Sequence, residues 1–264
     1  MGMLIFIGLG PYDGKDISIR GLEELKSCDL IFAEFYTATM ASGTIDYIEG
    51  MVNKKIEILP RTVLEDADRL LAHAGVTQKK VAILVPGDPL TATTHIDLLL
   101  TAKKQQIVTL VVHGPSIATI IPGLLGLQFY KFGRTTTLAY PDGEYFPKSP
   151  YDVIAENKKL GLHTLVLLDI QTDKQLYMTA NEGIELLLRI NSKRKDTVFT
   201  EKTLTCVVAR AGSSQPIVTA NFANVLLRQS FGPPMHSIVI PGKLHFKESE
   251  ALVLLANAPQ ELVN

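Results

Sequence analysis

The sequence predicts an α/β protein of two domains, the first built on a mostly parallel sheet and the second on a mixed sheet. Over residues 1–114, short apolar runs alternate with helical patterns, which is typical of parallel strands joined by crossover helices. Three of these runs end in glycine turns that could converge at one edge of the sheet: Gly8-Leu9-Gly10, Gly87-Asp88-Pro89 and His113-Gly114-Pro115. Over residues 115–264 the strands follow one another more closely, which favours a mixed sheet in the second domain.

The elements of the first domain follow from the spacing of apolar residues. Short apolar runs bounded by glycine, proline or polar residues predict strands, and apolar residues three and four apart predict helices. The expected strands are 3–7, 28–35, 55–59, 81–84 and 107–112, and the expected helices are 18–27, 45–51, 64–74 and 93–104.

The second domain is assigned in the same way. Ser116 is a candidate N-cap for the helix that opens it, and Thr179 and Glu182 have the spacing of a capping box for a helix that runs through residue 190. The expected strands are 131–140, 163–169, 203–209, 217–219 and 236–240, and the other expected helices are 151–160, 221–228 and 247–255.

The turn at Gly87-Asp88-Pro89 is the candidate centre of function. It follows a buried strand, and ligands of open α/β sheets bind beyond the carboxyl ends of the strands. Glycine allows a close approach, and Asp88 is the one charge in the turn. An ordinary turn remains an equal alternative, because glycine, proline and aspartate are favoured in turns for local reasons.

Composition narrows the classes of function. The chain has 264 residues and a net charge of −1, which gives no indication of a nucleic-acid partner or of binding to an anionic membrane. The apolar run 117–127 is shorter than the roughly 20 residues that span a bilayer, and we expect no signal peptide. Cys28 and Cys206 have no metal-binding spacing, so we expect buried, reduced thiols, no metal and a cytoplasmic protein.

Common cofactor and nucleophile motifs are absent from the sequence. The stretch Gly8-Leu9-Gly10-Pro11 lacks the third glycine of a dinucleotide-binding turn, and Pro11 has no amide hydrogen to offer a phosphate. Neither a Walker A pattern nor a Gly-x-Ser-x-Gly elbow occurs. What remains is a set of glycine and proline turns that suits a cofactor held by backbone groups and apolar walls.

A series of short stretches, in order along nearly the whole chain, resembles the diphthine synthase family. The stretches are Phe6-Ile7-Gly8-Leu9-Gly10, Ala33-Glu34-Phe35-Tyr36-Thr37, Pro86-Gly87-Asp88-Pro89-Leu90, Ala92-Thr93-Thr94-His95, Tyr130-Lys131-Phe132-Gly133, Gly161-Leu162-His163-Thr164-Leu165, Leu168-Asp169-Ile170, Tyr177-Met178-Thr179-Ala180-Asn181-Glu182, Ala209-Arg210-Ala211-Gly212 and Pro241-Gly242-Lys243-Leu244-His245. The short link from Asp169 to Tyr177 is similar to that of archaeal members.

The resemblance implies a fold like that of the tetrapyrrole methylases, with S-adenosylmethionine in the cleft between two α/β domains and a homodimer as the working form. The residues at the family's cofactor-binding positions are Pro11, Asp88, Thr91, Ser116, Ile117, Leu167, Ala211 and His236. Pro11 and Thr91 depart from the residues common at their positions, and we expect those contacts to be made through the backbone.

The resemblance also implies the acceptor, a histidine of translation elongation factor 2 that carries a 3-amino-3-carboxypropyl group. The amino nitrogen of that group would receive three methyl groups. It must arrive uncharged, and its proton could pass to an acidic side chain, to His236 or to water. For Asp88 we favour a role in binding over a role as base.

Two other functions are compatible with parts of the sequence. A precorrin-type tetrapyrrole C-methyltransferase would share the fold, but the stretches Tyr130–Gly133 and Pro241–His245 match diphthine synthases instead. A non-catalytic protein that binds the elongation factor would not need the intact glycine turns and Asp88.

Overall fold

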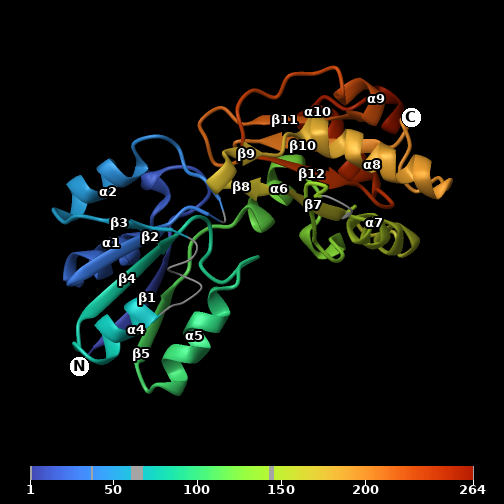
Figure 1. Cartoon of the computed structure of the whole chain (residues 1–264). Helices are drawn as coiled ribbons and strands as arrows, with labels where there is room; N and C mark the ends of the chain where they lie inside the picture. Colours follow the sequence, from blue (N-terminus) through green and yellow to red (C-terminus); the bar gives the residue numbers. More distant parts are fainter. Residues whose placement is uncertain (1, 37, 61–67, 143–145, 264) are drawn as a thin grey trace. The chain divides into compact units, whose positions relative to one another are not determined.

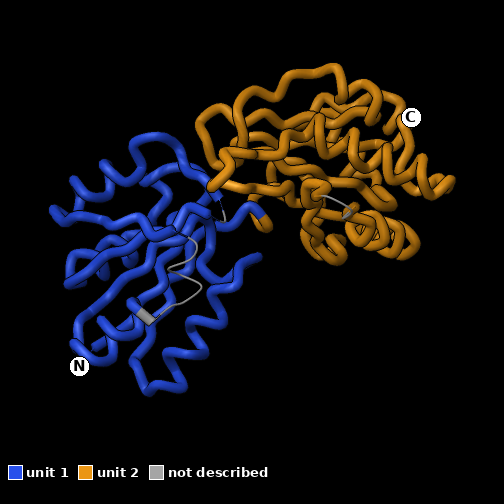
Figure 2. The backbone as a smooth tube through the Cα atoms, in the orientation of Figure 1, with its two compact units in different colours: residues 1–117 blue, residues 118–264 orange. Residues whose placement is uncertain are grey.

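The computed structural model describes residues 2–36, 38–60, 68–142 and 146–263. The chain divides into two compact units, unit 1 from Met1 to Ile117 and unit 2 from Ala118 to Asn264 (Figure 2). The domain boundary that the sequence places after residue 114 stays a prediction. Each unit is described by itself.

Unit 1 contains a five-stranded sheet in the order β3-β2-β4-β1-β5, and each pair of neighbours is parallel. The strands are β1 (Met3–Gly8), β2 (Leu30–Glu34), β3 (Glu57–Leu59), β4 (Lys80–Val85) and β5 (Val108–Val112). The parallel N-terminal sheet that the sequence predicts is therefore confirmed.

Helices cover both faces of this sheet, α1 (Ile19–Ser27) and α2 (Thr44–Val52) on one face, α4 (Asp68–Gly75) and α5 (His95–Lys104) on the other (Figure 1). Successive residues of a strand point to opposite faces, so Leu4 and Phe6 pack toward α4 and α5 while Ile5 and Ile7 pack toward α1 and α2. Both faces are buried, which explains why the strands of unit 1 are nearly continuous apolar runs.

Some boundaries in unit 1 differ from the predicted ones, and one predicted helix is only partly described. The strand β2 begins after residue 28 because Cys28 ends α1, where its N–H donates to the carbonyl of Leu25 at 3.1 Å. The helix α5 begins at His95 and not at residue 93. Of the predicted helix 64–74, residues 64–67 lie outside the described residues, and the rest belongs to α4.

Unit 2 contains a second five-stranded sheet in the order β11-β10-β12-β7-β6. Only β6 and β7 are parallel, and the other neighbours are antiparallel, so the predicted mixed sheet is also confirmed. The strands are β6 (Thr136–Leu138), β7 (Thr164–Leu168), β10 (Leu204–Ala209), β11 (Ile217–Phe222) and β12 (His236–Ile240).

The helices of unit 2 complete its core. They are α6 (Ile117–Leu125, which begins at the last residue of unit 1), α7 (Ser149–Lys159), α8 (Ala180–Arg194), α9 (Ala223–Leu226) and α10 (Phe246–Ala256). Tyr151 of α7 and Leu187 of α8 pack with Ile238 of β12, and all three side chains are fully buried. The predicted capping box is present, since Glu182 N–H donates to Thr179 Oγ1 at 3.2 Å and Thr179 N–H donates to Glu182 Oε2 at 2.7 Å.

Two predicted elements of unit 2 are wrong in extent. The strand predicted over 131–140 shrinks to β6, because the backbone of Arg134 bonds to the side chain of Asn157 instead of a neighbouring strand. The helix predicted over 221–228 shrinks to α9, because Asn221 and Phe222 extend β11 and pair with β10. In both places, partners distant in sequence override the local pattern.

The remaining elements are short. They are 3-10 turns at Gly14–Asp16, Phe129–Lys131, Thr172–Lys174 and Gln260–Leu262, and a hairpin of β8 (Ile170–Gln171) with β9 (Leu176–Tyr177). Among the described residues, no helix has the length and apolar character needed to cross a membrane. Cys28 and Cys206 are buried and unpaired.

Candidate functional site

The three glycine turns meet at the carboxyl edge of the unit 1 sheet. Gly10 and Gly87 exchange two backbone hydrogen bonds, with N–H to O distances of 3.1 and 2.7 Å. A Cβ placed on Gly8 would lie 2.5 Å from the carbonyl oxygen of Gly87 and 2.6 Å from the nitrogen of Gly114, so no larger residue fits there. The convergence that the sequence predicts is therefore confirmed.

Gly87 itself faces open space. Its φ is +70°, a left-handed conformation that favours glycine, and among the described residues no heavy atom beyond its chain neighbours lies within 4 Å of the place where a Cβ would stand. Backbone without a side chain at an open strand end lets a ligand approach closely. This edge therefore fits a cofactor held by backbone groups, as the sequence led us to expect.

The carboxylate of Asp88 fixes the shape of the turn. Oδ1 accepts bonds from Leu90 N–H and from the Thr91 hydroxyl, both at 3.0 Å, and Oδ2 lies 2.7 Å from His113 Nδ1. Burial alone would raise the pKa of Asp88, but the bonds from Leu90, His113 and Thr91 outweigh it and lower the pKa. Asp88 is thus an ionised carboxylate that is hydrogen-bonded within its own turn, and the Thr91 hydroxyl is one of its donors.

Five of the eight predicted cofactor residues lie at this edge. Pro11 follows β1, Asp88 and Thr91 follow β4, and Ser116 and Ile117 follow β5 at the start of α6. Since β4, β1 and β5 are neighbours in the sheet, the structure brings these five positions to one edge of unit 1.

The other three predicted cofactor residues lie together at one end of the unit 2 sheet. Leu167 of β7 is paired with Ser237 of β12, and His236 is paired with Ala209 of β10. Ala211 follows β10 at the same end, and it is buried. The antiparallel pairing explains how the carboxyl ends of β7 and β10 meet the amino end of β12.

His236 has no ring nitrogen left for a proton transfer. Ala180 N–H donates to its Nδ1 at 3.1 Å, and its Nε2–H donates to the carbonyl of Pro233 at 3.1 Å. Burial lowers its pKa, so the ring stays neutral. His236 is therefore no longer a candidate for the base. Its Nδ1 binds the backbone N–H of Ala180 in the first turn of α8.

A cluster that sequence reasoning did not single out lies at the end of β2. Glu34, Tyr36 and His95 come together there, although the first two are about sixty positions away from the third. His95 Nε2 lies 3.4 Å from the Tyr36 hydroxyl and 3.7 Å from Glu34 Oε1, and its Nδ1 lies 3.2 Å from the carbonyl oxygen of Pro89. Both contributing stretches carry the family resemblance, which was the only signal in the sequence.

A second buried cluster surrounds Glu248, whose side chain is 1% exposed. Glu248 accepts bonds from Gln128 N–H at 2.9 Å, His245 N–H at 2.8 Å and His163 Nε2 at 3.0 Å, and it pairs with Lys131. Burial alone would raise the pKa of Glu248, but these bonds lower it to about 2. The cluster joins three of the stretches that carry the resemblance, at the end of the sheet opposite Leu167 and His236.

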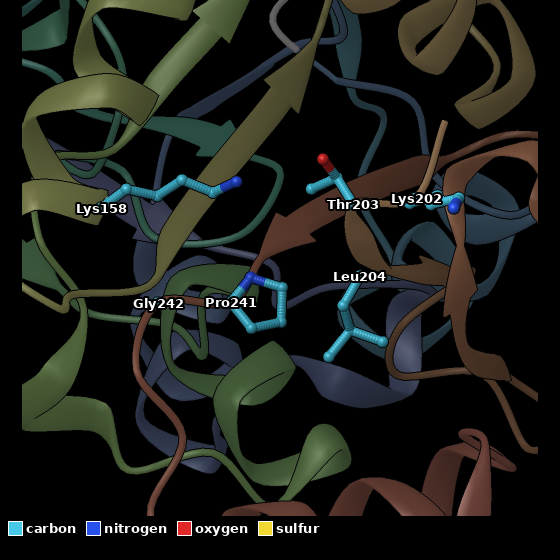
Figure 3. Close-up of a pocket in the computed structure, with 6 residues that line it drawn as sticks. All are labelled: Lys158, Lys202, Thr203, Leu204, Pro241 and Gly242. Atoms are coloured by element: carbon cyan, nitrogen blue, oxygen red, sulfur yellow. The ribbon is translucent and has the colours of Figure 1, made fainter. Parts of the chain in front are cut away.

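A hollow of about 440 Å³ lies at the same far end of the unit 2 sheet, where β10 begins and β12 ends (Figure 3). It is lined by Lys158, Lys202, Thr203, Leu204, Pro241 and Gly242, and none of the predicted cofactor residues is among them. Lys158 Nζ donates to the carbonyl of Val198 at 2.6 Å, and Gly242 N–H donates to His163 Nδ1 at 3.0 Å. We therefore base the candidate site on the strand ends and not on this hollow.

Within the part of the chain that the structure describes, no three His, Cys, Asp or Glu side chains come together in a way that could hold a metal ion.

Comparison with known families gives the class of protein. The model of the family "Tetrapyrrole (Corrin/Porphyrin) Methylases" matches residues 3–224, which is most of the chain. The fold, with a parallel sheet in unit 1 and a mixed sheet in unit 2, agrees with that class.

Curated relatives and solved structures narrow the assignment. A diphthine synthase of Methanococcus maripaludis is 46% identical over 254 residues, 96% of this chain and 98% of that protein. A diphthine synthase of Methanothermobacter thermautotrophicus is 45% identical over 261 residues, 99% of this chain and 98% of that protein. A crystal structure of diphthine synthase has a TM-score of 0.90 at 35% identity and covers 99% of this chain and 98% of its own. A putative diphthine synthase from Entamoeba histolytica has a TM-score of 0.87 at 36% identity and covers 98% of this chain and 100% of its own.

The chain belongs to the diphthine synthases, within the tetrapyrrole methylase family. Members are methyltransferases of diphthamide biosynthesis that use S-adenosylmethionine as methyl donor. The resemblance stated from sequence alone is thereby confirmed.

Proposed function

We propose that this protein methylates the amino nitrogen of a 3-amino-3-carboxypropyl group on a histidine of translation elongation factor 2. The observation that carries the proposal is the 46% identity to a diphthine synthase over 96% of the chain. The nitrogen receives three methyl groups, because it keeps a lone pair for attack until the third methyl is added. The reaction takes place in the cytoplasm, together with its acceptor.

The cofactor positions form part of the proposal. They are Pro11, Asp88, Thr91, Ser116 and Ile117 in unit 1, and Leu167, Ala211 and His236 in unit 2. When bound, S-adenosylmethionine supplies an electrophilic methyl group, so the protein's own task is to bind and orient. The open backbone at Gly87 and the rigid turn held by Asp88 support such a role for the unit 1 edge.

Orientation and desolvation are what the protein adds to the reaction. Holding the amine nitrogen in line with the methyl carbon replaces a chance encounter by a prearranged one. An amine reacts only in its neutral form, and burial of an amine lowers its pKa by penalising the charged form. The rate should therefore rise with pH until the acceptor amine is largely deprotonated.

We also infer that the protein is a homodimer. Large apolar side chains are exposed on unit 2, among them Phe129, Tyr130 and Phe246, which are 61%, 78% and 69% exposed. Aromatic residues are enriched at protein interfaces relative to the rest of the surface. Light scattering should give twice the 28.9 kDa of the chain, whereas a mass of 28.9 kDa at micromolar concentration would contradict the dimer.

Intact mass spectrometry of the acceptor tests the proposed function. Elongation factor 2 carrying the aminocarboxypropyl histidine is incubated with the protein and excess S-adenosylmethionine. We expect gains of one, two and then three methyl groups, with no further gain. The unmodified factor and a precorrin serve as controls and should stay unchanged. Methylation of the unmodified factor at a similar rate, or of the precorrin, would refute the assignment.

A further inference from the structure

The Glu34–Tyr36–His95 cluster lies on the same edge as the candidate cofactor turn. Glu34 and Tyr36 come from the end of β2, and β2 is the neighbour of β4, whose end carries the Gly87-Asp88-Pro89 turn. His95 lies at the first position of α5, directly after that turn. The cluster is therefore built by the two strand ends that flank this side of the edge.

The hydrogen bonds of His95 assign its tautomer. Nδ1 lies 2.8 Å from the Thr93 hydroxyl and 3.2 Å from the carbonyl oxygen of Pro89. The carbonyl can only accept a hydrogen bond and the hydroxyl can accept one as well, so a proton on Nδ1 satisfies both contacts. Nε2 then presents its lone pair to the Tyr36 hydroxyl, 3.4 Å away. The ring of Tyr36 stands edge-on to the imidazole, with centroids 6.3 Å apart and an interplanar angle of 71°.

Burial keeps the His95 ring neutral, and the Glu34 carboxylate offsets part of the cost of protonating it. The side chains of His95 and Glu34 are 2% and 0% exposed, and Tyr36 is partly exposed. Burial lowers the pKa of His95, while the Glu34 carboxylate opposes that shift, so the ring is neutral near neutral pH. Among the described residues, Glu34 and Tyr36 are the titratable groups in contact with His95. The carboxylate, 3.7 Å from Nε2, is placed to stabilise an imidazolium.

We propose that Tyr36 and His95 form the proton relay of the methyl transfer, with Tyr36 facing the acceptor amine and Glu34 supporting His95 from behind. The inference rests on the proposed function. In each transfer one N–CH₃ bond forms and one S–CH₃ bond breaks, with the bonding pair left on sulfur. After the first and the second transfer the nitrogen still carries protons, and one of them passes to the Tyr36 oxygen as the hydroxyl proton of Tyr36 passes to His95 Nε2. The imidazolium then releases a proton to solvent, and the nitrogen is neutral for the next transfer. The third transfer gives a quaternary nitrogen with no proton to release.

The surroundings of His95 differ from those of a buried histidine with a purely structural role. A buried imidazole needs only one partner for each ring nitrogen, and His236 shows that arrangement with two backbone partners. His95 instead has the Tyr36 hydroxyl within hydrogen-bond reach of Nε2 and the Glu34 carboxylate near the same nitrogen, so a proton passed to Nε2 meets a negative charge. Tyr36 is the catalytic residue of the relay, and His95 and Glu34 act through it.

Single-turnover kinetics of Tyr36→Phe test the relay. The rate of methyl transfer to the modified elongation factor is measured between pH 6 and pH 10 with enzyme saturated in S-adenosylmethionine. A general base contributes about 10²- to 10⁴-fold, so the variant should lose a comparable factor at pH 7. The loss should shrink as the pH rises, because hydroxide replaces the relay. Affinity for S-adenosylmethionine should stay within about twofold, since no bond at the Asp88 turn is removed.

Two further variants sharpen the outcome. The double variant with His95→Asn should be about as slow as the slower single variant, because residues acting in series are not additive. Tyr47→Phe, on exposed α2 and outside the cluster, is the matched control and should behave as wild type. A Tyr36→Phe variant with the wild-type rate and pH profile would overturn the relay while leaving the proposed function intact. A wild-type protein that transfers no methyl group to the modified factor would overturn both.

Discussion

His113 Nδ1 lies 2.7 Å from Asp88 Oδ2, so the loop after β5 is tied to the loop after β4. The strand β1 lies between β4 and β5 in the sheet, and its own turn at Gly10 is bonded to Gly87. All three loops of the candidate cofactor edge are therefore joined to one another. The carboxylate of Asp88, with a 10% exposed side chain, is the polar centre of this connection.

Asp88→Ala should weaken S-adenosylmethionine binding about 10- to 150-fold, the equivalent of roughly 1.5–3 kcal/mol for a bond to a charged group. Because Asp88 holds Leu90, Thr91 and His113, we expect the free energy of unfolding to fall by about 1–3 kcal/mol as well. Calorimetric titration and urea unfolding measure the two effects, and Thr91→Val should show a weaker form of both. A folded Asp88→Ala variant with unchanged affinity would remove Asp88 from the site.

Gly87→Ala and Gly43→Ala form a matched pair. Both glycines have positive φ, +70° and +79°, and in the described part of the chain no neighbouring atom lies within 4 Å of the place where a Cβ would stand on either. Each substitution should cost about 1–2 kcal/mol of backbone strain. Only Gly87→Ala should also weaken cofactor binding, by about tenfold or more, because its methyl group occupies the approach to the edge. Equal affinities of the two variants in a titration would mean that the cofactor does not approach Gly87.

Glu248→Gln should destabilise the protein at neutral pH. Breaking a buried ion pair costs about 3–5 kcal/mol, and we expect about 3 kcal/mol because Lys131 is 21% exposed. The folded pKa of Glu248, about 2, lies below its ordinary value of 4.5. Its contribution is therefore complete above about pH 4.5 and is lost as the pH falls toward 2.

Urea unfolding of wild type and Glu248→Gln at several pH values between 7 and 2.5 checks this. The difference between the two proteins should narrow across the acid range. Glu250→Gln is the control, since Glu250 is 49% exposed and pairs with Lys247 on the surface, where a pair contributes at most about 1 kcal/mol. A constant difference down to pH 2.5 would contradict the proposed titration of Glu248.

Cys28 and Cys206 should resist thiol reagents in the folded protein. Both are buried, and burial raises the pKa of Cys28 to about 11 and raises that of Cys206 as well, so little thiolate exists at pH 8. A chromogenic disulfide reagent should react slowly with native protein and quickly with two thiols after denaturation in guanidinium chloride. Rapid reaction of one native thiol would show that its surroundings open readily.

The sequence predicts those parts of the fold that local pattern controls. The three central strands of unit 1, β1, β2 and β4, are mostly apolar and buried along almost their whole length, so each leaves a clear signal. The capping box at Thr179 is a purely local feature, and it is present as predicted. Elements whose ends depend on distant partners were extended wrongly, as at Asn157 and at the pairing of Asn221 with Thr205.

The candidate site was predictable in position but not in chemistry. The convergence of the turns at Gly10 and Gly87 follows from parallel strands, which all end at one edge. The contacts between side chains could not be predicted in the same way. Asp88 lies beside His113, and Glu34 beside His95, only because of the order of the strands in the sheet. The satisfied ring of His236 shows the same limit, since its partners Ala180 and Pro233 are set by the packing of α8.

The cluster around Glu248 has a consequence for how this group of proteins can diverge. Lys131, His163 and His245 belong to three separate stretches, yet each supplies a bond to the same carboxylate. His245 does so through its backbone N–H, which any residue except proline would also supply. A change of Lys131 or His163 instead removes a side-chain partner of the buried carboxylate, which is far more costly than a surface change. Lys131, His163 and Glu248 must therefore be kept together or replaced together. The stretches that contain Lys131 and His163 help to recognise the diphthine synthases. They reflect a requirement of folding, and they lie away from the strand ends where the chemistry is proposed.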